Sequence, residues 1–141
     1  MMKIMRPKNF LILLIFVGYS SCFSQVLKMK AFEIAFKYQD EYSQQWKPWS
    51  DWEDVDILIT IDSDPQRIKV FSKKEQIYDV IQYKGETTNS DGDITSEWLC
   101  VNEDGRKCGI RIVIPYKQST IQQLYVDFSD FMFVYNIYKL D

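Results

Sequence analysis

The sequence contains no histidine, and only 3 of its 141 residues are cysteine. Histidine is the usual general base near neutral pH and a common zinc ligand, so its absence argues against histidine-dependent catalysis and against a zinc site. There is also no internal repeat, no low-complexity tract and, beyond residue 24, no helix-period pattern with capping residues. These absences favour a single β domain.

The chain also lacks a run of basic residues. Its formal net charge is −3, with 17 Lys and Arg against 20 Asp and Glu. Three of the basic residues lie in the first 24 positions and none of the acidic ones do, so the remainder carries a charge of −6. An acidic chain without clustered Lys and Arg cannot displace counterions from a phosphate backbone, which argues against nucleic acid as a partner.

The first 24 residues resemble an export signal. A basic head precedes the apolar run Phe10–Val17, which is too short to span a bilayer. The predicted cut lies between Ser24 and Gln25, giving a signal peptide (1–24) and a single β domain (25–141) in the periplasm or outside the cell. The alternative is a lipoprotein cut before Cys22, which would anchor the chain to a membrane through this residue. No later stretch is long and apolar enough to span a membrane.

The segment from Trp98 to Ile110 reads as a β-hairpin. Asn102-Glu103-Asp104-Gly105 has the residues of a tight turn with glycine in the left-handed position. This register sets Cys100 opposite Cys108 on an apolar face, and an oxidising compartment then predicts a disulfide between them. In the chain-entropy model, a disulfide that closes this short loop would stabilise the folded state by about 2–3 kcal/mol. A metal pair is the alternative, but zinc needs four ligands.

Alternating apolar and polar residues predict eight short strands joined by turns. The expected strands are 31–38, 54–61, 68–71, 76–83, 94–101, 107–114, 121–128 and 131–139, with a long loop at 84–93. The economical architecture is an all-β antiparallel meander, either a small lipocalin-like barrel or a sandwich, and closure favours the barrel because it hides the edges. The predicted inward residues are large and apolar, so we expect a filled core.

One strand is apolar on both faces. Phe131–Tyr138 carries aromatic or aliphatic side chains at nearly every position. It is either covered on its outer side by the N-terminal segment, which we expect, or exposed as a surface for a partner. The residues proposed for such an interaction surface are Trp46, Trp49, Trp52, Phe131, Phe133 and Tyr135.

The three tryptophans are spaced like the ladder of thrombospondin type 1 repeats. That family stacks its tryptophans with arginines and has several disulfides; the likeness here covers only seven residues, so we reject the homology. Exposed indoles at Trp46, Trp49 and Trp52 could stack on sugar rings. The expected role is instead to plug one end of the β core, because tryptophan is mostly buried.

Two acidic groupings are candidate sites. Asn89–Asp93 resembles the middle of a calcium loop, with ligands Asp91, Asp93 and either Asp62 or Asp64, but strands flank it and required carboxylates are missing, so a solvated turn is expected. A glycosidase would use a carboxylate pair. The candidates are Asp62, Asp64, Glu97 and Asp127, and the spacing singles out no pair.

The whole chain resembles small exported all-β proteins of Bacteroidetes bacteria that have no established activity. The resemblance rests on Trp49-x-x-Trp52, Ile59-x-Ile61-Asp62, Cys100-x-x-x-Asp104-Gly105-x-x-Cys108 and Val134-Tyr135-x-Ile137-Tyr138. We expect no enzymatic activity, no cofactor and no metal. The expected function is a binding or interaction module of the cell envelope, with a protein partner there. The alternative is a lipocalin-like carrier of a small apolar ligand.

Overall fold

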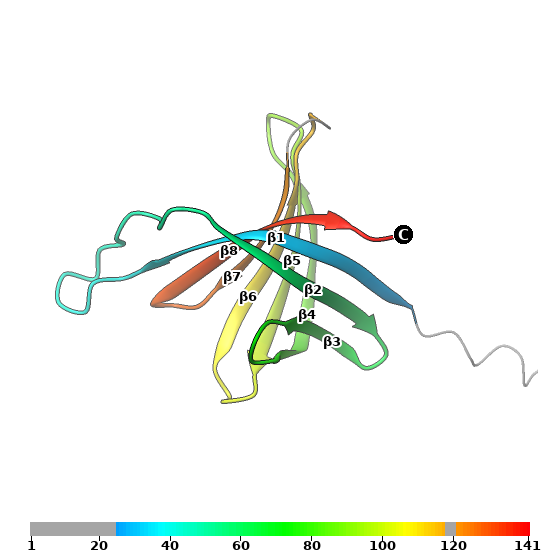
Figure 1. Cartoon of the computed structure of the whole chain (residues 1–141), viewed down its shortest axis with the longest axis horizontal. Helices are drawn as coiled ribbons and strands as arrows, with labels where there is room; N and C mark the ends of the chain where they lie inside the picture. Colours follow the sequence, from blue (N-terminus) through cyan, green and yellow to red (C-terminus); the bar gives the residue numbers. More distant parts are fainter. Residues whose placement is uncertain (1–24, 118–120) are drawn as a thin grey trace, which may run out of the picture.

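The computed structural model describes residues 25–117 and 121–141. It is all-β: eight antiparallel strands form a closed barrel in which each strand pairs with the next and the last pairs with the first (Figure 1). The strands are β1 (Val26–Tyr38), β2 (Glu53–Ser63), β3 (Gln66–Phe71), β4 (Gln76–Thr88), β5 (Ile94–Asn102), β6 (Lys107–Ile114), β7 (Gln122–Asp127) and β8 (Phe131–Lys139). The predicted meander is confirmed, as a barrel rather than a sandwich.

Two further expectations concern membranes and the N-terminus. In the part of the chain that the structure describes, no helix is long and apolar enough to cross a membrane. The predicted signal peptide and Cys22 lie in residues 1–24, outside the described residues.

The β5–β6 hairpin has the predicted register. Cys100 pairs with Cys108, and the pairing continues in step to Ile94 and Ile114. The Asn102 side-chain oxygen accepts the N–H groups of Asp104 and Arg106, at 3.1 and 2.8 Å. Gly105 closes the turn at a φ of 81°. The turn chemistry therefore sets which residues of this hairpin face inward.

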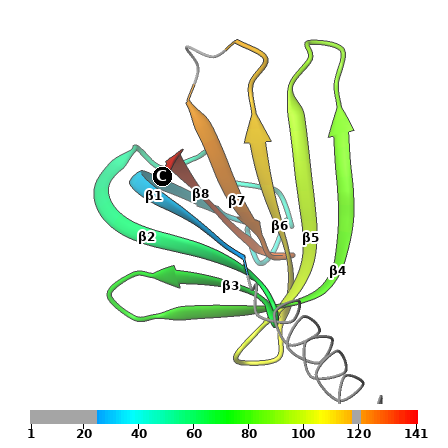
Figure 2. The same cartoon turned by 90° about the vertical axis from the view of Figure 1, so that its right-hand side faces the viewer.

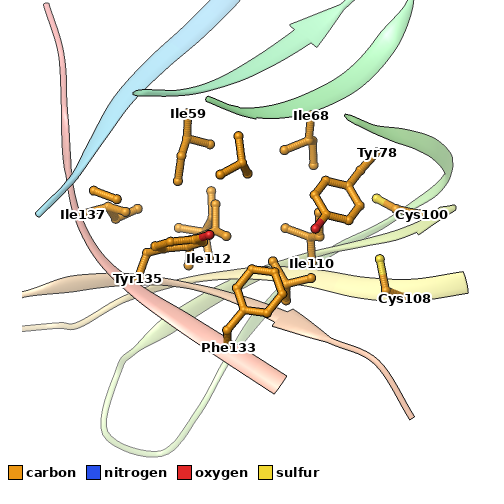
Figure 3. Packing of buried hydrophobic residues seen from close by; sticks show 14 of the residues in the cluster. Ile59, Ile68, Tyr78, Cys100, Cys108, Ile110, Ile112, Phe133, Tyr135 and Ile137 are labelled. Carbon is orange, nitrogen blue, oxygen red and sulfur yellow. The ribbon is translucent and has the colours of Figure 1, made fainter. Parts of the chain in front are cut away.

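The barrel interior is occupied by packed side chains. The buried cluster consists of Met29, Ala31, Ile59, Ile68, Val70, Tyr78, Cys100, Cys108, Ile110, Ile112, Leu124, Val126, Phe128, Phe133, Tyr135 and Ile137 (Figure 3). The largest of these to be almost completely buried is Tyr135, with 1% of its surface exposed. Burial of a large apolar side chain stabilises the fold by roughly 1.5–3 kcal/mol, so these residues supply most of the driving force for closure. The expected filled core is present.

A β-bulge divides β1 into two halves. Met29 and Ala31 point into the core before the bulge, which lies between Ala31 and Glu33. After it, Ile34 and Phe36 pack against the core, whereas Phe32 packs against the exposed ring of Tyr138, 6.0 Å between centroids. The predicted strand at 31–38 is present, but the extra residue in the bulge reverses its alternation, so its apolar side chains do not all face the core.

The predicted loop at 84–93 is also corrected. β4 continues to Thr88, and only residues 89–93 form the turn. Bulges at Val80/Gln82 and Tyr83/Gly85 let the strand bend, and Gly85 takes a φ of 91° that other residues rarely adopt. The long β4–β5 hairpin rises beside the β6–β7 hairpin at one end of the barrel (Figure 2). The N–H of Tyr116 donates to Asp93 Oδ1 at 3.0 Å and joins the two tips.

Candidate binding surface on the outer wall

The tryptophan segment, residues 46–52, runs alongside the second half of β1. The N–H of Lys47 donates to the carbonyl of Tyr38, and the N–H of Ser50 donates to the carbonyl of Phe36, both at 2.8 Å. The Ser50 hydroxyl in turn accepts the N–H of Phe36 at 2.9 Å. β2 begins at Glu53 and pairs with β1 only as far as Ile34. Beyond that point the tryptophan segment lies beside β1 instead, and hydrogen bonds fix its backbone although it is not a regular strand.

Two of the tryptophans belong to a cation–aromatic stack on the outside of the barrel. Lys37 Nζ lies 5.2 Å from the ring centre of Trp46 and 4.7 Å from that of Trp49. Trp49 packs edge-to-face with Tyr125, with 6.2 Å between the ring centres, and the guanidinium carbon of Arg111 lies 3.8 Å from the centre of the Tyr125 ring. We call these five residues the outer stack. Cations over aromatic faces contribute about 0.5–1 kcal/mol each at exposed sites.

The outer stack covers the outside of β8. Val134 pairs with Ala35 of β1 on one side and with Tyr125 of β7 on the other. Because Trp49 reaches Tyr125 from the β1 side, its ring must cross the outer face of β8. This explains why Val134 and Ala35 are only 3% and 2% exposed although they point away from the core. The middle of the strand is covered as expected, but by residues 46–52, while Tyr138 near the end of the strand stays 51% exposed.

The six residues proposed as an interaction surface are split by the structure. Phe133 and Tyr135 are buried in the core, at 7% and 1% exposure, and Phe131 is half-buried. Phe133 and Tyr135 are therefore unavailable as a docking surface on the wall, whereas Phe131 keeps part of its ring exposed and lines a hollow with Arg106 and Asp130. The tryptophans remain partly exposed: Trp46 by 36%, Trp49 by 39% and Trp52 by 44%. They lie on the wall, so the expectation that they plug one end of the core was wrong.

A groove lies next to the outer stack on the barrel wall. It has a volume of about 800 Å³, and its lining includes Trp52, Asp91, Asp93, Tyr116, Gln123 and Asn136. We call it the Trp52 groove. Its walls come from the tryptophan segment and from the joined tips of the β4–β5 and β6–β7 hairpins, and its floor comes from β7 and β8. Elements far apart in the sequence thus converge on one hollow of the wall.

A chain of hydrogen bonds crosses the floor of the Trp52 groove. The Tyr125 hydroxyl donates to Gln123 Oε1 at 2.7 Å, and Gln123 Nε2 donates to Asn136 Oδ1 at 3.0 Å. Asn136 Nδ2 then donates to Glu33 Oε1 at 3.1 Å. Asn136 is only 4% exposed, so this amide needs its partners to offset desolvation. The chain fixes the polar groups of the floor and links them to the outer stack through Tyr125.

The cysteine pair is buried in the barrel wall. Cys100 and Cys108 are 0% and 4% exposed and directly opposite each other, and both are free cysteines, so the predicted bond is not formed here (Figure 3). Burial raises the pKa of the Cys100 thiol to about 12 and that of Cys108 to about 11. Buried, protonated thiols are poor nucleophiles and poor metal ligands.

The acidic candidates form no common site, and among them Glu97 and Asp127 approach each other on either side of Gly109. In residues 25–117 and 121–141, no three His, Cys, Asp or Glu side chains are grouped to hold a metal ion. Asp91 and Asp93 line the Trp52 groove, whereas Asp62 pairs with Val26 at the start of β1. The hydrolase candidates Glu97 and Asp127 are drawn to cations: Lys84 lies 4.0 Å from Glu97, and Arg111 Nε donates to Asp127 at 2.7 Å.

A second hollow of about 400 Å³ lies at the end of the barrel beside the β5–β6 turn. Tyr78, Phe128 and Phe133 contribute aromatic surface to it, and Gln76 contributes an amide. The hydroxyl of Tyr78 donates to Gln76 Oε1 at 2.5 Å, and burial raises the pKa of this tyrosine. This hollow is the place where a small apolar ligand could contact the core.

Comparison with protein-family models, with curated proteins and with solved structures finds no match. The candidate surface therefore rests on its own geometry. Sequence reasoning missed Lys37, Tyr125, Arg111, Gln123 and Asn136, which come from four different strands. One visible signal was Asn136, a single amide within an otherwise apolar or aromatic strand.

Proposed function

We propose that the chain is an exported, non-enzymatic binding module of the cell envelope that holds its partner on the outer wall of the barrel. The observation that carries this proposal is the exposure of Trp46, Trp49 and Trp52 on one anchored segment, while the interior is filled by side chains. Tryptophan is enriched among the residues that dominate binding energy at interfaces.

The anchoring of these rings supports a binding role. Lys37 and Tyr125 hold Trp49 from two sides, and backbone hydrogen bonds to β1 fix the segment that carries it. A side chain that is ordered before binding loses less conformational entropy when its partner arrives. The outer stack is thus a pre-organised surface, in which roughly a third or more of each indole is still open to a partner.

Export is part of the proposal. Residues 1–24 would be removed before Gln25, or cut before Cys22 in a lipoprotein. In an oxidising compartment Cys100 and Cys108 would then join. Asn102 and Arg106 lie two positions nearer the turn than the cysteines and form a hydrogen-bonded pair. Hydrogen-bonded and non-hydrogen-bonded pairs alternate along an antiparallel ladder, so Cys100 and Cys108 are also a hydrogen-bonded pair, with Cα atoms about 5.5 Å apart. That separation lies within the range that a disulfide spans, so no change of register is needed.

A carrier of a small apolar ligand is the second candidate. It is supported by the hollow of about 400 Å³ at the barrel end, where Tyr78, Phe128 and Phe133 meet. Its capacity is limited because the core behind these rings is occupied. Native mass spectrometry of the exported protein tests it: a co-purifying small molecule that is lost in a Phe133→Ala variant would favour the carrier.

A photo-crosslinking amino acid placed at position 46 tests the wall proposal. In cells that export the chain, we expect an adduct of higher mass from position 46. The control is the same group at Ile81, which is 52% exposed on β4 and is not part of the outer stack. Equal adduct patterns at the two positions, or none at either, would overturn the proposal.

A further inference from the structure

The Trp52 groove combines an exposed indole with polar groups held in fixed positions. Trp52 is 44% exposed on one wall, and Tyr116 is 74% exposed at the hairpin tips. Gln123 and Asn136 present amides on the floor, and their mutual hydrogen bond of 3.0 Å fixes both orientations. A ligand for such a hollow needs a flat apolar face for the ring and a hydroxyl-rich rim for the amides and carboxylates.

The charge of the groove narrows the class of ligand. Asp91 and Asp93 lie on its rim, and Lys117 is the single basic residue among its described lining residues. Asp93 is held in place because its carboxylate accepts the N–H of Tyr116 at 3.0 Å and the amide of Asn89 at 3.4 Å. Two carboxylates against one ammonium disfavour phosphate, sulfate and uronate groups, whereas an uncharged hydroxyl can donate to a carboxylate.

Hydrogen-bonding capacity is left over for a ligand. Gln123 Nε2 carries two N–H groups, and the floor chain uses one of them, to Asn136. Asp91 is exposed, and its side chain makes no hydrogen bond or ion pair within the described residues. The groove therefore offers at least one donor and one acceptor together with Trp52, which is 44% exposed.

We infer that the Trp52 groove binds a neutral oligosaccharide, with one pyranose ring stacked on Trp52 and its hydroxyls hydrogen-bonded to Gln123 and the rim carboxylates. A pyranose has an apolar C–H face and a polar edge, which match the indole and the floor. The volume of about 800 Å³ lies within the range of roughly 300–1,000 Å³ that is typical of small-molecule sites. This inference rests on the proposed function and names the ligand class for one part of the wall.

The test titrates the purified mature chain with hexasaccharides by calorimetry. The neutral probes are the β-1,4-linked hexamers of glucose, mannose and xylose and the α-1,4-linked hexamer of glucose; the anionic probe is hexagalacturonate. We expect binding of at least one neutral probe and none of hexagalacturonate. Trp52→Ala should weaken the binding at least tenfold, and Trp52→Phe, which keeps a smaller ring, should weaken it less.

The matched control is Tyr42→Ala. This change removes an aromatic ring that is 94% exposed and that belongs neither to the groove nor to the outer stack. Affinity for the neutral probe should stay within twofold. The inference is overturned if no neutral hexamer binds at millimolar concentration, if only hexagalacturonate binds, or if Trp52→Ala variants that keep the native circular dichroism bind as the wild type does.

The failure of this inference differs from the failure of the proposed function. If crosslinks form from position 46 but no neutral hexamer binds, the wall has another partner and only the oligosaccharide is excluded. If neither result is obtained, both proposals fall.

Discussion

Arg111 lies over the ring of Tyr125, its directly paired neighbour on the next strand, with the guanidinium carbon 3.8 Å from the ring centre. The same guanidinium donates to Asp127 at 2.7 Å. This contact fixes the ring of Tyr125, and Trp49 packs against that ring. Arg111 of β6 and Tyr125 of β7 therefore support the tryptophan segment, which follows β1 in the chain.

The first prediction follows from this dependence. Tyr125→Leu removes the surface that Trp49 and Arg111 share and also the hydroxyl that donates to Gln123. We expect the free energy of unfolding to fall by about 1–3 kcal/mol. The measurement is urea denaturation followed by tryptophan fluorescence, whose native spectrum should also shift to the red. Tyr42→Leu, at a ring 94% exposed, should change neither, and equal effects would contradict the prediction.

The architecture could be predicted because its signals are local. In the β5–β6 hairpin, Asn102 and Gly105 specify the turn, and two-residue alternation then specifies every pair from Cys100–Cys108 to Ile94–Ile114. Bulges are less visible. Nothing in Ala31-Phe32-Glu33 marks an extra residue, because the bulge is imposed by pairing β1 with β2 and β8 at the same time.

The candidate surface could be predicted only in part. The tryptophan spacing drew attention to the right segment, but its partners Lys37, Tyr125 and Arg111 are brought to it by barrel closure. Closure sets β1, β8, β7 and β6 side by side, and no local pattern encodes which outward residues then meet across three strand boundaries. β8 is apolar on both faces, which indicated that its outer face is covered. Which residues cover it could not be predicted, because residues 46–52 are brought there by the closure of the barrel.

The second prediction compares two glycines that share a left-handed backbone. Gly105 has a φ of 81° and no atom within 4 Å of an added Cβ, whereas Gly92 has a φ of 84° and the Tyr116 ring within 3.1 Å. Gly105→Ala should cost about 1–2 kcal/mol from backbone strain alone. Gly92→Ala should cost about 1 kcal/mol more, because the ring must move. Thermal unfolding of both variants checks this, and equal losses would show that Tyr116 moves freely.

The third prediction concerns the buried amide on the outer wall. Asn136→Ala leaves Gln123 without its acceptor and Glu33 without its donor, so we expect a loss of about 1–3 kcal/mol. Glu33→Gln is the matched change, since it keeps an acceptor oxygen for the Asn136 amide and should be close to neutral. Urea denaturation of the two variants distinguishes them. A neutral Asn136→Ala would mean that the floor chain does not contribute to stability.

The fourth prediction concerns processing and oxidation. Intact-mass spectrometry of the exported protein should show a chain that begins at Gln25 and lacks two hydrogen atoms because of a Cys100–Cys108 bond. Reduction should restore the two hydrogens, and Cys108→Ser should never show the deficit. A lipid on Cys22 would contradict the first part, and two free thiols in freshly exported protein would contradict the second.

The fifth prediction is the pH dependence of the reduced protein. Burial raises the pKa of Cys100 to about 12 and that of Cys108 to about 11, from an ordinary value of 9.0. The thiols therefore stay protonated in the folded state while the unfolded chain ionises above pH 9, so the free energy of unfolding should fall as pH rises from 9 to 12. The Cys100→Ala/Cys108→Ala double variant is the control, and its stability should fall less over the same range.

At pH 8, iodoacetamide should label the folded reduced protein far more slowly than the urea-unfolded chain, because the thiolate is the reactive form. Equal labelling rates would mean that the barrel wall opens at the cysteine pair faster than alkylation occurs.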